Sequence, residues 1–218
     1  MADAATVFDL ATDPLRELNQ KLHNLTAATA KTPWRIVHPR GAHAVAAGVE
    51  VPVKIDIEGH VGYYCAGMID GPTVAVQGSA GWGLAESMMD GTVVVHGGAG
   101  NGAGAAMRSG TVVIHGDAAA RLGVSIKGGL ILVAGNCGYM AGFMGQRGTL
   151  IVCGDAGPAF ADSMYETVCY VGGSITELGI DTVVEEPSEA DWAFLKSTLS
   201  YHFPTQTEIP TFKKVVSG

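Results

Sequence analysis

One glycine recurs at a nearly fixed interval through the middle of this chain. Six such glycines are nineteen residues apart and a seventh follows after eighteen: Gly59, Gly78, Gly97, Gly116, Gly135, Gly154 and Gly172. A short β-forming run precedes each of them, for example TVVVH before Gly97 and TVVIH before Gly116. A repeat of about twenty residues is typical of stacked-coil architectures, in which each coil buries its apolar face only against its neighbours. The period therefore predicts a solenoid.

Aligning the repeats on these glycines gives two apolar columns two residues apart, as one buried face of a strand requires. They are Ile55, Val74, Val93, Val112, Ile131, Leu150 and Val168, and Ile57, Val76, Val95, Ile114, Val133, Val152 and Tyr170. A second inward ladder follows about ten residues after each glycine: Ile69, Met88, Met107, Ile126 and Met164, with Met144 one position early. We expect an all-β fold, a single-stranded right-handed parallel β-helix of about seven 19-residue coils with flanking N- and C-terminal α-helices.

The position between the two inward columns faces outward, yet it is polar only in the first coil. Its members are Asp56, Ala75, Val94, Val113, Leu132, Ile151 and Cys169. An apolar strip of this size does not remain in water, so either the terminal helices of the chain or a partner subunit must cover it. The sequence predicts a partner interface at Val94, Val113, Leu132 and Ile151.

Helix signals flank the repeat on both sides. Asp13 and Pro14 precede leucines at helical spacing, and Pro187-Ser188-Glu189 precedes Trp192, Leu195 and Leu199. Three segments are predicted: an N-terminal helix and extended connector over 1–52, the β-helix over 53–185, and a C-terminal helix and tail over 186–218.

Composition excludes several function classes. The net charge of −8 and the pI near 5.2 oppose binding to nucleic acid or to an anionic membrane. Residues 128–146 carry no charge, but the glycine register continues through them and assigns them to a coil. The N-terminus lacks a basic region and a long apolar stretch, so we expect a cytoplasmic protein. Four cysteines without a CxxC pair favour reduced thiols.

Several short motifs imitate functional sites. Gly98-x-Gly100-x-x-Ala103 resembles a dinucleotide fingerprint, but the next predicted strand follows too soon for a crossover helix, and tight corners with positive φ explain its glycines. His96 and His115 share a register, which favours packing over a metal site. Asp117, Asn136 and Asp155 form a ladder that favours bonds to the backbone, with calcium binding as the alternative. No catalytic, cofactor-binding or metal-ligating residue is predicted on this chain.

The coil motifs, glycine-strand-glycine with corners such as Met88-Met89-Asp90-Gly91 and Met107-Arg108-Ser109-Gly110, resemble the GXGXG domain of glutamate synthase-like proteins. Four segments are similar to the stand-alone GXGXG subunit of three-subunit enzymes of this kind, including N-methylglutamate synthase. They are Leu15–Asn19, Gly59–Met68, Gly154–Gly157 and Asp162–Glu166. The resemblance implies a structural brace in a hetero-oligomer. Its expected partners are a class II glutamine amidotransferase-like subunit and a glutamate synthase-like subunit that holds FMN.

Two other functions stay open at this point. The same domain type occurs as one of the subunits of formylmethanofuran dehydrogenase, so a component of such a dehydrogenase or of a formyltransferase/hydrolase complex is the first alternative. A free-standing β-helix enzyme or binding protein is the second, although the aligned outward columns show no cluster of charged residues that such an enzyme would need.

Overall fold

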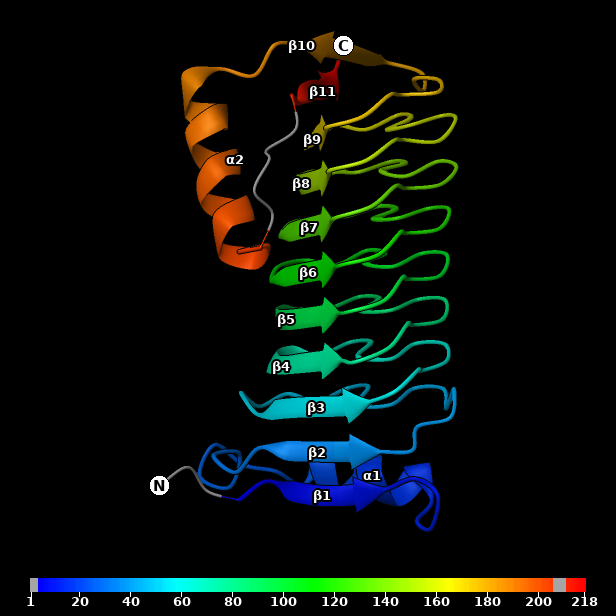
Figure 1. Ribbon diagram of the computed structural model, residues 1–218, viewed down its shortest axis with the longest axis vertical. Coiled ribbons are helices and arrows are strands. Elements are labelled where there is room, and N and C mark those ends of the chain that lie inside the picture. The colour runs from blue at the N-terminus through cyan, green and yellow to red at the C-terminus, as the bar shows by residue number, and fades with distance from the viewer. Residues whose placement is uncertain (1–3, 206–210) are drawn as a thin grey trace.

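The computed structural model describes residues 4–205 and 211–218, and these form a parallel β-solenoid with two helices (Figure 1). The all-β fold predicted from the glycine period is confirmed. The elements are β1 (Thr6–Asp9), α1 (Leu15–His23), β2 (Trp34–Val37), β3 (Lys54–Glu58), β4 (Asp70–Val76), β5 (Asp90–Val95), β6 (Thr111–Ile114), β7 (Leu130–Val133), β8 (Arg147–Val152), β9 (Glu166–Val171), β10 (Thr182–Glu185), α2 (Glu189–His202) and β11 (Lys213–Ser217).

The strands form one sheet in the order β1 to β9, then β11 and β10. Neighbours from β1 to β9 pair in parallel, whereas β11 pairs antiparallel with both β9 and β10. A column of isolated bridges runs along a second side of the coils, for example from Ala80 to Ala99 and from Ala99 to Ala118. Figure 1 shows the strands stacked one above another, with β1 at one end of the stack.

The recurring glycine is required because adjacent coils approach too closely there for any side chain. A Cβ at Gly116 would lie 2.9 Å from the carbonyl carbon of Gly97, and one at Gly154 would lie 2.8 Å from the carbonyl oxygen of Gly135. Of the seven glycines that define the period, only Gly59 has a positive φ. Close packing of backbone on backbone therefore sets the glycine period.

The last coil corrects the predicted alignment by one residue. Leu150 pairs with Cys169 and Ile151 with Tyr170, so Cys169 faces inward and is fully buried while Tyr170 faces outward. The prediction that Tyr170 is inward and Cys169 outward is wrong. Gly173, whose amide donates to the carbonyl of Gly154 at 2.9 Å, is the structural equivalent of the earlier glycines, and the period stays at nineteen.

The second inward ladder is confirmed except in one coil. Ile69, Met88, Met107 and Ile126 are fully buried and Met164 is 3% exposed. Met144 is 47% exposed, so its assignment to the ladder is wrong.

Gly145 takes the ladder position that Met144 was expected to fill. A Cβ on Gly145 would lie 2.5 Å from the hydroxyl of Thr167, which therefore takes the space that a ladder side chain fills elsewhere. The Thr167 hydroxyl is buried and has no hydrogen-bond partner among the described residues.

Strand pairing begins before the repeat that the sequence reveals. Residues 33–52, predicted as an extended connector, contain β2, in which Trp34 pairs with Ile55 of β3. The corner that follows β2 also bonds to the next coil, as when Gly62 donates to Ala42 and Ala66 donates to Val45. The stack therefore continues below β3. The three predicted segment boundaries stay a prediction.

Helix α1 packs against the N-terminal coils. Its Leu18 and Leu22 are buried, and Asn19 donates to the carbonyl of Ala44 at 2.9 Å and accepts from the amide of Ala46 at 3.1 Å. The N-cap residue is Pro14 and makes no side-chain cap, so Asp13 does not cap this helix.

Helix α2 begins with a capping box in which the Ser188 hydroxyl accepts from the Asp191 amide and the Asp191 carboxylate accepts from the Ser188 amide. This start matches the predicted one. Desolvation raises the pKa of Asp191, but hydrogen bonds from Tyr170, Ser188 and Lys214 outweigh it and hold that pKa well below its usual range. Asp191 thus links α2 to β9 and β11.

Candidate functional site

The outward apolar strip is covered by the chain itself. Val113, Leu132 and Ile151 are 1%, 0% and 0% exposed, and they form one buried cluster with Leu195 and Leu199 of α2. Figure 1 shows α2 alongside the upper strands of the stack. Three of the four residues predicted as a partner interface therefore offer no free surface, because α2 fills the space above them.

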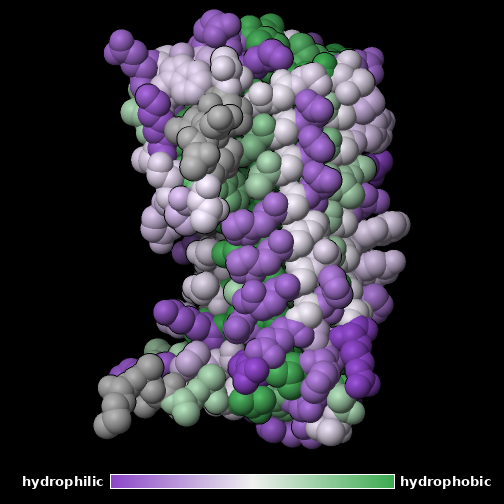
Figure 2. Space-filling view, viewed as in Figure 1, coloured by the Kyte–Doolittle hydropathy of each residue, from purple (hydrophilic) through white to green (hydrophobic). Residues whose placement is uncertain are grey.

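Val94, the fourth predicted interface residue, is only partly buried at the edge of the α2 cluster. Below it, the same outward column carries the half-buried Ala75, then Asp56 and Arg35, which pairs with Glu58. Figure 2 shows hydrophilic side chains along this lower part of the strand face. The outward column thus turns polar where α2 no longer reaches.

The aligned histidines lie beside the end of α2. The rings of His96 and His115 stack with centroids 4.9 Å apart, and Phe203 meets His115 edge-on at 5.1 Å. The pKa of His115 is lowered by desolvation and, to a smaller extent, by the neighbouring His96. The pKa of His202 is lowered by desolvation and, to a smaller extent, by His115. Across residues 4–205 and 211–218, no group of three or more His, Cys, Asp or Glu side chains is placed to hold a metal ion. The histidines act here as packing groups.

The Asx ladder joins coil to coil. Asp117 accepts from the amide of Asn136 at 2.7 Å, Asn136 accepts from Asp155 at 2.8 Å, and Asp155 accepts from Ser174 at 2.7 Å. The hydrogen bonds from Ser174 hold the pKa of Asp155 below its usual range. The predicted backbone bonding is confirmed, and it reaches the next coil rather than the residue's own turn.

The fingerprint-like glycines lie in the corner between β5 and β6, where the structure has turns and no helix. Gly98 and Gly100 do not have positive φ. A Cβ on Gly98 would lie 2.9 Å from the carbonyl of Asp117, and one on Gly100 would lie 2.8 Å from the backbone of Gly81. The corner assignment is confirmed, but close approach, not backbone conformation, explains these two glycines.

The four cysteines are buried, and burial raises the pKa of Cys65 and of Cys137 to about 12 each. Neither thiol is poised to ionise near neutral pH. The uncharged segment 128–146 contains β7 and belongs to a coil, as predicted. Within the described part of the chain, neither helix is long and apolar enough to cross a membrane.

A surface that the sequence did not single out lies on the corner that follows each strand. We call it the aromatic corner and define it by His43, Tyr63, Tyr64, Met68, Trp82 and Glu86. The rings of His43 and Tyr63 stack at 4.6 Å, and those of Tyr63 and Trp82 at 5.4 Å. Tyr64, Met68 and Trp82 are 52%, 62% and 54% exposed, which is unusual for side chains of this size that lie together.

Small residues of the following coils shape the aromatic corner. A hollow of about 390 Å³ is lined by Tyr64 and Trp82, by the small residues Gly83, Gly102, Ala105 and Ala120, and by Arg121 and Val124 of a later coil. A second hollow of about 290 Å³ is lined by Tyr64, Gly67, Met68, Glu86 and Ser87. Tyr64 and Glu86 belong to both hollows.

One sequence signal for this surface was present. The corner position of Tyr63 and Trp82 recurs every nineteen residues as Asn101, Ala120 and Tyr139, so Tyr63 and Trp82 are the pair of aromatic residues that fall in adjacent coils of this column. The stretch Gly59–Met68 indicates a family resemblance by its motif, whereas the aromatic column appears only when this corner position is aligned from coil to coil.

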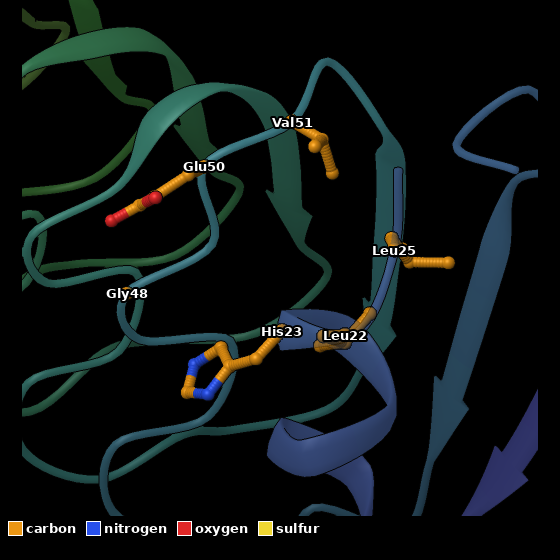
Figure 3. A pocket seen from close by; sticks show the side chains of 6 residues that line it. All are labelled: Leu22, His23, Leu25, Gly48, Glu50 and Val51. Carbon is orange, nitrogen blue, oxygen red and sulfur yellow. The ribbon is translucent and has the colours of Figure 1, made fainter. Parts of the chain in front are cut away.

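A third hollow, of about 350 Å³, lies between the end of α1 and the loop over residues 48–51 (Figure 3). His23 lies at its margin, and its Nε2 is 2.8 Å from the carbonyl oxygen of Ala47. Glu50 is the acidic residue among those that line it, and His23 is engaged in docking α1.

Comparisons with known proteins find a sequence relative and structural neighbours. The chain is 54% identical over 68 residues to protein GlxC of Rhizobium meliloti (strain 1021), a match that covers 31% of this chain and 30% of that protein. The chain thus spans less than a third of the length of this curated relative. No family model matches the chain.

One structural neighbour is a chain in the crystal structure of the formyltransferase/hydrolase complex FhcABCD from Methylorubrum extorquens with methylofuran. The likeness has a TM-score of 0.58 at 24% sequence identity and covers 91% of this chain and 85% of that one. At this identity the likeness shows a shared fold.

Proposed function

We propose that this chain is a non-catalytic assembly subunit of a heteromeric glutamate synthase-like complex, N-methylglutamate synthase in particular. That enzyme makes N-methylglutamate and ammonia from methylamine and glutamate. In this proposal FMN and any nucleophile are on the partners, a glutamate synthase-like subunit and a class II glutamine amidotransferase-like subunit, and the complex is cytoplasmic.

The aromatic corner is the observation that carries the assembly role. Its exposed Tyr64, Met68 and Trp82 lie on a rigid stack of coils, and aromatic and methionine side chains are enriched in protein interfaces. The motif resemblance supports the glutamate synthase-like assignment, and the identity to GlxC supports a role shared with that protein.

A component of a formyl-transferring complex is the second candidate. It is supported by the structural likeness, which covers most of both chains and comes from a formyltransferase/hydrolase complex. Both candidates predict a subunit that works inside a larger assembly, and they differ in the partners.

Native mass spectrometry of the endogenous complex, purified through a tag on this chain, tests the assignment. We expect two further subunit types, FMN absorbance in the complex and methylamine-dependent formation of N-methylglutamate. Partners of the formyltransferase or hydrolase type would replace the first candidate with the second. A chain that elutes alone and turns over substrate by itself would overturn the assembly role.

A further inference from the structure

Tyr64 and Glu86 converge on one point of the aromatic corner. A Cβ at Gly83 would lie 2.6 Å from Cδ1 of the Tyr64 ring and 2.9 Å from Oε2 of Glu86. Gly83 has no side chain and a φ of +68°, so both groups close over bare backbone. Trp82, on the residue before, lines the same hollow. A carboxylate and two aromatic rings thus surround a single open site.

The charges of this site are unbalanced. Within residues 4–205 and 211–218, the Glu86 carboxylate takes part in no hydrogen bond or ion pair. The one basic residue that lines the same hollow is Arg121, two coils along the stack, or roughly 10 Å at a spacing of about 4.8 Å per coil. The Glu86 end therefore favours a cation, and Arg121 confines that cation to this end.

A guanidinium group fits these surroundings best. It stacks on the faces of Trp and Tyr and at the same time pairs with a carboxylate through its planar fork of N–H donors. The stem of an arginine side chain is apolar enough to pack against Met68 at the rim.

We propose that the aromatic corner binds an arginine side chain of a partner subunit, with the guanidinium over Tyr64 and Trp82 and paired with Glu86. The inference rests on the proposed assembly role and names the contact through which it operates. The arginine lies at the centre of the contact, and Met68 contacts apolar residues beside it.

The test uses a tagged full-length chain expressed in its own host in place of the native copy. Glu86→Gln and Trp82→Ala are compared with wild type for the partner subunits that remain bound through a dilution series. Glu177→Gln and Tyr139→Ala are the matched controls, since Glu177 is exposed near the end of the stack and Tyr139 occupies the same corner column as Trp82. Thermal unfolding of each isolated variant reports on its folding.

We expect Glu86→Gln and Trp82→Ala each to weaken partner binding about tenfold or more while both controls bind as wild type. A photo-cross-linking residue in place of Tyr64 should join a partner peptide that contains arginine. Partners that bind wild type and both variants equally, or a cross-linked peptide without arginine, would overturn this inference and leave the assembly role intact. Wild-type chain without partners would overturn both.

Discussion

Gly154→Ala tests the close approach of coils that the glycine period reflects. The new methyl group would meet the Oδ1 atom of Asn136 and lie 2.8 Å from the carbonyl oxygen of Gly135. Asn136 accepts a hydrogen bond from the amide of Asp155 at 2.8 Å, so displacing its side chain breaks a contact between adjacent coils.

Two contributions set the loss of stability that we expect for Gly154→Ala. Overpacking a tightly packed position costs about 1–3 kcal/mol. Losing one backbone-to-side-chain hydrogen bond costs about 1 kcal/mol, because Asp155 is exposed and water can replace the acceptor. The sum of about 2–4 kcal/mol corresponds to a fall in Tm of about 4–16 °C, since 1 kcal/mol shifts the Tm of a chain of this size by about 2–4 °C.

Thermal unfolding followed by circular dichroism measures this shift. Gly67→Ala is the matched control, because a Cβ there lies 3.3 Å from its nearest neighbour and the backbone φ is not positive. In the double variant Gly154→Ala/Asn136→Ala the loss should be smaller than the sum of the single losses, since one side of the collision is gone. Equal Tm values for Gly154→Ala and Gly67→Ala would refute the close-approach explanation of the period.

Three further perturbations test other parts of the fold. Val113→Asp places a carboxylate under α2 at a position that is 1% exposed, and we expect α2 to detach and the variant to bind an apolar dye strongly. The control variant Ala75→Asp lies in the same column beyond α2 and should bind little dye. Thr167→Val replaces a buried hydroxyl without a partner among the described residues by a methyl group, and it should stabilise the chain by about 1 kcal/mol in urea unfolding, so a destabilised variant would contradict the assigned burial. The pKa of His115 lies below its ordinary value of 6.5, so the contribution of this side chain to stability is complete above about pH 6.5 and is lost as the pH falls below that value. His115→Gln should therefore reduce the drop in Tm between pH 7.5 and pH 5. An unchanged drop in Tm would exclude His115 as its source.

Periodicity made most of the fold predictable. Inward columns such as Val93 and Val95 can be read from the sequence because a strand alternates its faces and a narrow coil interior admits only apolar side chains. The errors arose where one residue decides the alignment. Gly172 and Gly173 are adjacent, and the pairing of β8 with β9 and the hydrogen bond from Gly173 to Gly154 show that Gly173 continues the column.

The candidate site was less predictable because it depends on tertiary packing. The pattern around Leu195 and Leu199 predicts a helix, but no period in the sequence states where that helix docks. The sequence therefore left two possible covers for the outward strip. Tyr64 and Glu86 lie in adjacent coils, at positions three residues apart in the aligned repeat. They converge because Gly83, which aligns with Tyr64, places no side chain between them.

The location of α2 changes which surface is free for a partner. The outward column is apolar beneath α2, at Val113 and Leu132, and charged at Asp56, where no helix covers it, so its composition follows the cover that the chain itself supplies. A partner that replaced α2 would have to displace a helix held by its buried Leu195 and Leu199 and by the bonds of Asp191 to β9 and β11. The aromatic corner requires no such displacement, because Tyr64 and Trp82 are already exposed on a stack whose backbone is fixed by bonds to both neighbouring coils. An assembly role for this chain is therefore better served by the corner than by the strand face.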